Sequence, residues 1–240
     1  QKLAGSMGEW EKLNSQLQHT IDLGADPPVF CAFVDKIHIH YGKAKRLLLT
    51  TDSSFYLLQK KFGGGFTLKR HFYWFDLLSI KEDNSTTFSF TFKSEVVTIQ
   101  NNQMDVLSQT IISHLFTLLN GEELSQIDFQ IGNFEKQENC IDPLLRFRAL
   151  CLYNNLHPPN SLNEPFELAI KYQSTHLPVS ADNDCISILL ECIQYTPFVK
   201  SLQIFSTKTK VWHILRDFIQ KNKSIQELEV DCKVDSDFIE

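Results

Sequence analysis

The chain has 240 residues, of which 42% are hydrophobic, 12% aromatic and 22% charged, and its formal net charge is −6. This composition predicts a folded globular protein of one large or two small domains. No stretch approaches the about 18 consecutive apolar residues of a membrane-spanning helix. An acidic chain is also a poor candidate for a general nucleic-acid binder, so we expect no nucleic-acid partner.

The charge is unevenly distributed along the chain. Residues 36–81 carry nine Lys or Arg side chains against Asp52 and Asp76, which gives this window a charge of +7. Such a concentration in an otherwise acidic protein predicts one anion-facing surface.

The first residues and the cysteines indicate the cellular compartment. Residues 1–7 read as an expression scar, and no secretory signal follows them. The six cysteines form no CxxC pair and lie in apolar surroundings, so we expect buried free thiols. These features predict a cytoplasmic protein, peripheral at a membrane if the anion-facing surface meets lipid.

Residues 8–27 form the first predicted region. Trp10, Leu13, Leu17 and Ile21 recur at helical spacing in 8–23, and Gly24 ends the pattern.

Seven strand-like runs come next, each rich in aromatic or β-branched residues and bounded by turn signals such as FGGG. They read VFCAFVDKIHIH, KRLLLTT, SFYLLQKK, FTLKRHFYW, LLSIKE, TTFSFTFK and EVVTIQ. Alternation in the sixth run places Phe88, Phe90 and Phe92 on one face. A helix follows, with the stripe Met104, Leu107, Ile111, Leu115 and Leu118, and Gly121 as its expected stop.

Seven short strands followed by one amphipathic helix resemble a pleckstrin-homology (PH) domain over residues 28–120. This resemblance implies a seven-stranded barrel with a C-terminal helix. The helix lacks the Trp that PH domains usually carry, which leaves PH-like relatives open.

Residues 121–163 are predicted to be a connector, with one short helix from Leu144 to Leu152. Residues 164–240 repeat themselves at a shift of 26, which places Leu202 on Leu228 and Ile204 on Val230. The segment PFELAI at 165–170 is a candidate for an earlier strand. Strands alternating with helices at this period indicate leucine-rich repeats (LRR) and the start of an α/β solenoid. The predicted fold class is therefore α+β, with a PH-like barrel followed by repeats.

A PH-like region, a connector and then LRR resemble the N-terminus of the CARMIL family, the capping-protein and myosin-I linkers. The segments AKRLLLTTDSSFYLL, MDVLSQTIISHLFTLL and RALCLYNN carry the resemblance. It implies a cytoskeletal adaptor, with the PH-like part on membranes and the LRR on protein partners or on a second copy. Because a solenoid needs several stacked units to be stable, we also expect this chain to be the N-terminal piece of a longer protein. Capping-protein binding in that family belongs to a tail and is assigned to no residue here.

Motifs for catalysis and metal binding are missing from the sequence. There is no GxSxG, HExxH or GxxxxGK[ST] motif, and the glycines of FGGGF fit a hairpin tip. His38 and His40 alternate on one predicted strand but lack further ligands, so a solvated face with Ile37 and Ile39 inward is expected. We expect no enzyme activity and no cofactor.

The basic residues of the first four strands are the candidate phospholipid site. They are Lys36, Lys43, Lys45, Arg46, Lys60, Lys61, Lys69 and Arg70. Phe62 and Phe66 beside the glycines are expected to reach into lipid headgroups, and His38 and His40 to strengthen binding below about pH 6.5.

The sequence therefore predicts a non-catalytic membrane-targeting and scaffold module of a cytoskeletal regulator. Its expected partners are an anionic phospholipid surface, proteins that meet the LRR and possible homodimer contacts. The alternative is a protein-binding, dimerising platform like that of PTB domains, with no lipid role.

Overall fold

The fold was analysed in a computed structural model, which describes residues 13–18, 20–21, 23, 26–38, 42–132, 138–207 and 211–232. The chain divides into two compact units, Gln1–Ile141 (unit 1) and Asp142–Glu240 (unit 2). The division falls inside the predicted connector. No helix in the described ranges has the length and apolar character that a membrane crossing requires.

Unit 1 is built on one large, mainly antiparallel sheet. Its strands are β1 (Pro28–His38), β2 (Gly42–Thr51), β3 (Ser54–Lys60), β4 (Phe66–Tyr73), β5 (Leu77–Asn84), β6 (Thr87–Phe92), β7 (Val96–Gln100) and β8 (Asp128–Gln130). Their order is β4-β3-β2-β1-β7-β6-β5-β8. All seven predicted strands are present. The predicted barrel does not close, because β5 pairs with the additional strand β8, in parallel, and not with β4.

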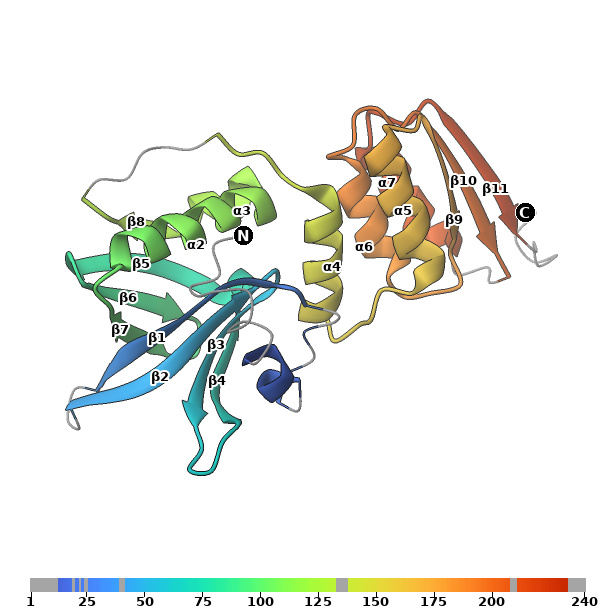
Figure 1. The fold of residues 1–240 in the computed structure, drawn as a ribbon. Helices are drawn as coiled ribbons and strands as arrows, with labels where there is room; N and C mark the ends of the chain where they lie inside the picture. The colour runs from blue at the N-terminus through green and yellow to red at the C-terminus, as the bar shows by residue number, and fades with distance from the viewer. Residues whose placement is uncertain are drawn as a thin grey trace. The chain divides into compact units, whose positions relative to one another are not determined.

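The sheet bends over on itself around an aromatic core (Figure 1). The ring centroid of Phe55 in β3 lies 5.4 Å from those of both Phe90 and Phe92 in β6. Phe72 in β4 stacks on Phe92 with a centroid separation of 4.3 Å. Strands β2, β1 and β7 separate β3 from β6 in the sheet order, so these contacts require a strongly concave face. We call it the inner face.

The opposite, outer face of β2, β3 and β4 is covered by the N-terminal segment. Residues 13–17 are helical, and Leu17 is fully buried. With Ile21 it packs in a second, smaller core whose sheet members are Cys31, Leu47, Leu49, Tyr56, Leu58 and Phe66. Because β2 is covered on both faces, its apolar residues run consecutively and do not alternate. Trp10, part of the predicted helical stripe, lies outside the described residues.

Helix α2 (Met104–Leu118) completes unit 1, and its predicted stripe is buried. A tryptophan on the sheet side packs close to this helix. Trp74, in the turn η1 (Trp74–Asp76), is fully buried and donates its indole N–H to the Thr51 carbonyl at 3.0 Å. Its ring lies 6.1 Å from that of His114 in α2. Gly121, the expected stop, instead begins α3 (Gly121–Ser125), which Asn120 caps.

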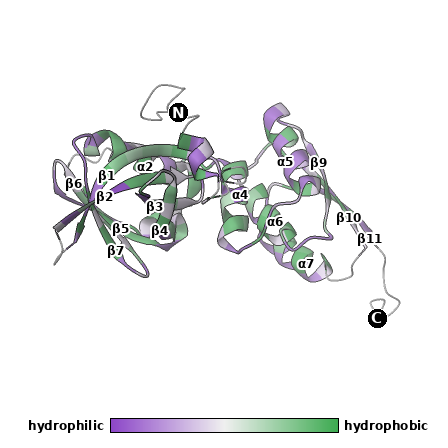
Figure 2. Cartoon of the chain, turned by 60° about the horizontal axis from the view of Figure 1, so that its bottom comes forward, coloured by the Kyte–Doolittle hydropathy of each residue, from purple (hydrophilic) through white to green (hydrophobic). Residues whose placement is uncertain are grey.

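In unit 2, helices alternate along the chain with the strands of a parallel sheet. Its elements are α4 (Pro143–Tyr153), α5 (Asn160–Tyr172), β9 (His176–Ser180), α6 (Ile186–Ile193), β10 (Ser201–Ser206), α7 (Val211–Lys221) and β11 (Glu227–Cys232). Helix α4 coincides with the predicted Leu144–Leu152 helix. Helix α6 is largely hydrophobic (Figure 2).

The parallel register of unit 2 matches the 26-residue shift. Leu202 lies opposite Leu228, and Ile204 lies opposite Val230. The prediction that 165–170 form the earlier strand is wrong, because this segment belongs to α5, where Leu162, Phe166 and Ala169 are buried at helical spacing. The earlier strand is β9, whose Leu177 pairs with Leu202.

Candidate functional site

Three hairpin turns of unit 1 lie at the same end of the sheet. Strands β1 to β4 form an antiparallel meander, so the β1–β2 and β3–β4 turns share one end. Ile37 pairs with Thr98, which brings the start of β7, and with it the β6–β7 turn, to that end as well. We call this region the basic end, because all eight predicted phospholipid-binding residues lie in or beside these strands and turns.

The strand register divides these residues between the two faces, so they do not form one surface as predicted. Lys36 lies opposite Ile99, which in turn lies opposite Phe88 of the inner core. Arg70 lies opposite Leu57, the position next but one to Phe55. Lys36, Arg46 and Arg70 are therefore on the inner face, while Lys43, Lys45 and Lys60 are on the outer face.

The outer face presents lysines to solvent. Lys43 and Lys45 are exposed, and the Lys43 ammonium donates a hydrogen bond to the side-chain carbonyl of Gln100. Asp35 lies directly opposite Lys45 in the β1–β2 ladder. Gln100 carries no charge, so the positive charge of Lys43 remains available to an anion.

The β3–β4 turn forms a projecting tip. Gly63, Gly64 and Gly65 all have positive φ angles, of 87°, 110° and 73°, a conformation that only glycine adopts readily. Phe62 at this tip is fully exposed, and Lys60, Lys61 and Lys69 beside it are exposed too. Phe66 was expected to reach lipid with Phe62, but this prediction is wrong. Its side chain is 3% exposed and belongs to the small core beneath the N-terminal segment.

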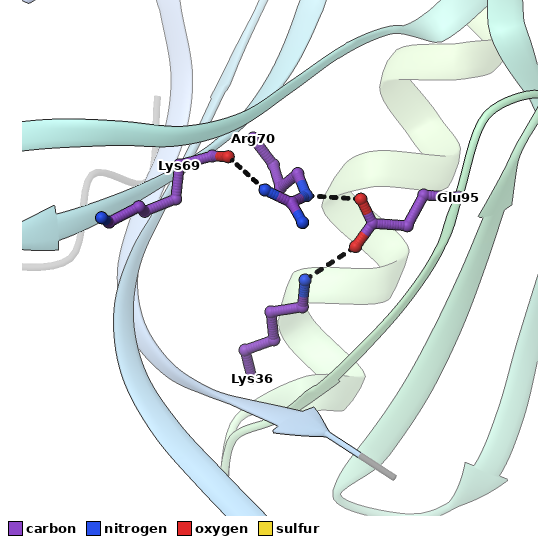
Figure 3. A network of polar contacts seen from close by, with 4 residues as sticks. All are labelled: Lys36, Lys69, Arg70 and Glu95. Atoms are coloured by element: carbon purple, nitrogen blue, oxygen red, sulfur yellow. Dashed lines mark hydrogen bonds and ion pairs between the residues drawn. The ribbon is translucent and has the colours of Figure 1, made fainter. Parts of the chain in front are cut away.

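A carboxylate that the sequence analysis missed holds two of the inner cations. Glu95, in the β6–β7 turn, pairs with the Lys36 ammonium at 2.9 Å and with the Arg70 guanidinium (Figure 3). Partial burial acts to raise the pKa of Glu95, but the hydrogen bonds and charges of Lys36 and Arg70 outweigh it and hold this pKa below its ordinary value. Lys36 and Arg70 are separated from Glu95 by 59 and 25 residues, so no local pattern could have indicated the pairing.

His38 does not have the predicted arrangement of a solvated histidine with Ile37 on the inward face. His38 shares a face with Val34 and Lys36, while Ile37 lies on the other face, and both are half-buried. His40 and Ile39 lie outside the described residues. His71 in β4 stacks on Tyr56, and burial, partly offset by Asp26, lowers its pKa.

At the other end of strands β1 to β3, away from the basic end, lies a buried polar cluster centred on Asp26. Its carboxylate accepts hydrogen bonds from the Ser53 backbone N–H at 2.9 Å, from the Ser53 hydroxyl at 2.8 Å and from the Thr51 hydroxyl at 2.5 Å. The Tyr56 hydroxyl donates to it at 3.4 Å. This cluster ties the segment before β1 to the β2–β3 turn. Within the described ranges, no group of three or more His, Cys, Asp or Glu is placed to hold a metal ion.

Comparisons with known proteins find partial structural overlaps. No protein-family profile and no curated protein matches the sequence. A structure concerning the PH and C1 domains of the Vav1 exchange factor is 7% identical, with a TM-score of 0.36, over 45% of this chain and 32% of that one. The linker-DH/PH domains of p115-RhoGEF are 11% identical, with a TM-score of 0.35, over 50% of this chain and 38% of that one.

A third structure, the hSac2 domain from the human phosphoinositide phosphatase Sac2, is 10% identical, with a TM-score of 0.37, over 57% of this chain and 96% of that one. The chain spans about a third of the length of the Vav1 and p115-RhoGEF chains. Independently of these partial overlaps, unit 1 resembles a PH domain in its strand order and in the helix that follows β7.

Proposed function

We propose that unit 1 is a PH-like module that binds anionic phospholipid surfaces through its basic end. The observation that carries this proposal is the position of the exposed lysines around a projecting tip. Lys43 and Lys45 lie on the outer face, and the exposed Lys60, Lys61 and Lys69 lie in the β3–β4 hairpin that carries Phe62. All lie at the end of the sheet where three hairpin turns meet.

The expected strength of membrane binding follows from the number of exposed lysines. Each basic side chain near an anionic membrane contributes about 1 kcal/mol. Five exposed lysines therefore give about 5 kcal/mol, which is a factor of about 10³ to 10⁴ in partitioning. Binding of this origin weakens as salt rises, because screening acts on exposed charges.

Co-sedimentation with anionic vesicles at low and physiological salt tests the proposal. The variant K43E/K45E is expected to lose most binding. The matched control K221E/K223E makes the same charge change in unit 2, at exposed lysines, and is expected to bind like the wild type. Equal losses in the two variants, or no binding by the wild type, would rule out a lipid site at the basic end.

For unit 2, we propose that its strands and helices are the first units of an LRR array that binds proteins. The support is the stacking of Leu177, Leu202 and Leu228 at equivalent positions of three parallel strands. With the PH-like module in front of it, this arrangement supports a CARMIL-like scaffold of the cytoskeleton. Pull-down with purified unit 2, compared with a variant that reverses the exposed charges of β11 (Glu227, Glu229 and Asp231), tests this part.

The alternative role, a peptide-binding platform, is favoured by one observation. Among the described residues, strand β4 pairs with a strand on one side only, whereas the edge of β5 is occupied by β8. Addition of an extended peptide strand is thereby directed to β4. A proline substituted at Thr67 would block such a peptide and leave vesicle binding unchanged.

A further inference from the structure

Glu95 bridges two cations that come from strands that do not pair with each other. Lys36 is in β1 and Arg70 is in β4, and β2 and β3 lie between them in the sheet. One carboxylate oxygen accepts from the Lys36 ammonium at 2.9 Å, and the other accepts from the Arg70 guanidinium (Figure 3). The carboxylate thus occupies a position at the concave face where two donors converge.

The three side chains at this position differ in their exposure to solvent. The Lys36 side chain is 9% exposed, that of Glu95 30% and that of Arg70 48%. A buried ammonium group requires an anion beside it, because burying it without a partner is strongly unfavourable. The position therefore favours an anion beside the Lys36 ammonium. Its Arg70 side is open enough for an anion from solvent to enter.

The chemistry of the two donors suits phosphate as well as carboxylate. Arginine offers a planar fork of donors and lysine a compact point charge, and both bind phosphate oxygens. A phosphomonoester carries a charge of about −1.5 to −2 at neutral pH and three acceptor oxygens. A phosphodiester carries one charge, as Glu95 does. A phosphodiester must also compete with the Glu95 carboxylate, which is part of the chain and therefore has a high local concentration at the site.

We propose that Lys36 and Arg70 form a phosphate site whose resident ligand is Glu95, and that Glu95 makes this site selective for phosphomonoesters over phosphodiesters. This inference rests on the anion-binding role proposed for unit 1. A phosphomonoester, on a lipid headgroup or on a soluble inositol phosphate, displaces Glu95. A phosphodiester does not, and binds only through the exposed lysines. The lowered pKa of Glu95 agrees with its close pairing to both cations.

The first test uses soluble inositol trisphosphate and isothermal titration calorimetry, with no membrane present. E95Q is expected to bind this probe about tenfold more tightly than the wild type. This factor applies if Glu95 leaves the site open in about one wild-type molecule in ten, whereas the site is open in every E95Q molecule. E122Q is the matched control. It removes one charge from an exposed residue of α3 and is expected to bind like the wild type. Equal affinities of E95Q and the wild type would overturn the role of Glu95.

A second pair of variants leaves Glu95 in place, in case E95Q does not fold. R70Q and K69Q each remove one positive charge from neighbouring residues of β4, but Lys69 points away from Glu95 (Figure 3). Both are tested on vesicles containing phosphatidylinositol phosphate or phosphatidylinositol at equal total lipid charge. R70Q is expected to lose the preference for the monoester lipid, whereas K69Q is expected to weaken both bindings equally. Equal behaviour of R70Q and K69Q would overturn the proposed selectivity.

Comparing the calorimetry with the vesicle assays distinguishes a lipid headgroup from a soluble inositol phosphate as the ligand. It also distinguishes the proposed membrane binding from the proposed role of Glu95. If E95Q binds inositol trisphosphate more tightly than the wild type does, but the wild type does not bind vesicles, the result would support the phosphate site and overturn the membrane role. Vesicle binding by the wild type without that gain would overturn the role of Glu95 alone. A gain on vesicles and on the soluble probe together would support a lipid headgroup as ligand.

Discussion

Replacing Asp26 with alanine is expected to destabilise unit 1 substantially. The carboxylate is 4% exposed and accepts from the Ser53 backbone N–H and from the hydroxyls of Ser53 and Thr51. The hydroxyls have other acceptors close by, since Thr51 also donates to the Ser54 carbonyl at 3.2 Å. A buried N–H without an acceptor costs about 1–3 kcal/mol, and a hydrogen bond to a charged group is worth about 1.5–3 kcal/mol. The expected loss is about 3–5 kcal/mol, a large part of the typical stability of about 5–15 kcal/mol.

Hydrogen–deuterium exchange of peptides from β2 and β3, followed across a urea series, measures this loss in unit 1 separately from unit 2. Asp105→Ala serves as the control, because Asp105 is exposed in the first turn of α2, where an acidic residue contributes about 0.3–1 kcal/mol. If Asp26→Ala changes the stability no more than this control does, the buried cluster does not hold the segment before β1 in place.

Three further predictions concern other parts of the chain. Because the pKa of Glu95 is lowered on folding, its stabilising contribution is complete above its ordinary value of 4.5 and is lost as the pH falls through the folded value. Acid unfolding of E95Q and the wild type should therefore converge at low pH. Phe62→Ser should weaken vesicle binding yet shift thermal stability by less than about 0.5 kcal/mol, because the ring is fully exposed. In unit 2, Leu202→Ala should cost about 2–5 kcal/mol in urea unfolding, whereas Phe205→Ala, at a 41% exposed position, should cost much less.

Much of the fold could be predicted because the sequence periodicity is strong. Phe88, Phe90 and Phe92 alternate with polar residues, and all three are buried. Strand β8 gave no such signal, since it has three residues and only the middle one is half-buried. Strand β9 was missed because it contains Pro178, which argues against a strand. It lies at the edge of its sheet, where proline is tolerated.

The candidate site was less predictable, because it depends on contacts between distant segments. The sequence indicates which residues are basic, but the face of each residue follows from the strand register. A bulge between Leu57 and Leu58 shifts that register just before Arg70, and one residue of shift moves a side chain to the opposite face. In the sequence, Glu95 looks like an ordinary solvent-exposed acidic residue of a turn. Its role becomes visible only when the fold brings Lys36 and Arg70 next to it.

The cover formed by Leu17 and Ile21 over the outer face has a practical consequence for domain boundaries. By resemblance to PH domains, a truncated protein would begin near Pro28, at the start of β1. Such a fragment would leave Leu47, Leu49, Leu58 and Phe66 open to water as one contiguous apolar surface. Surfaces of this kind promote self-association. The smallest well-behaved version of this module must therefore retain residues 13–23, and aggregation of a shorter version would reveal a boundary error and say nothing about lipid or protein binding.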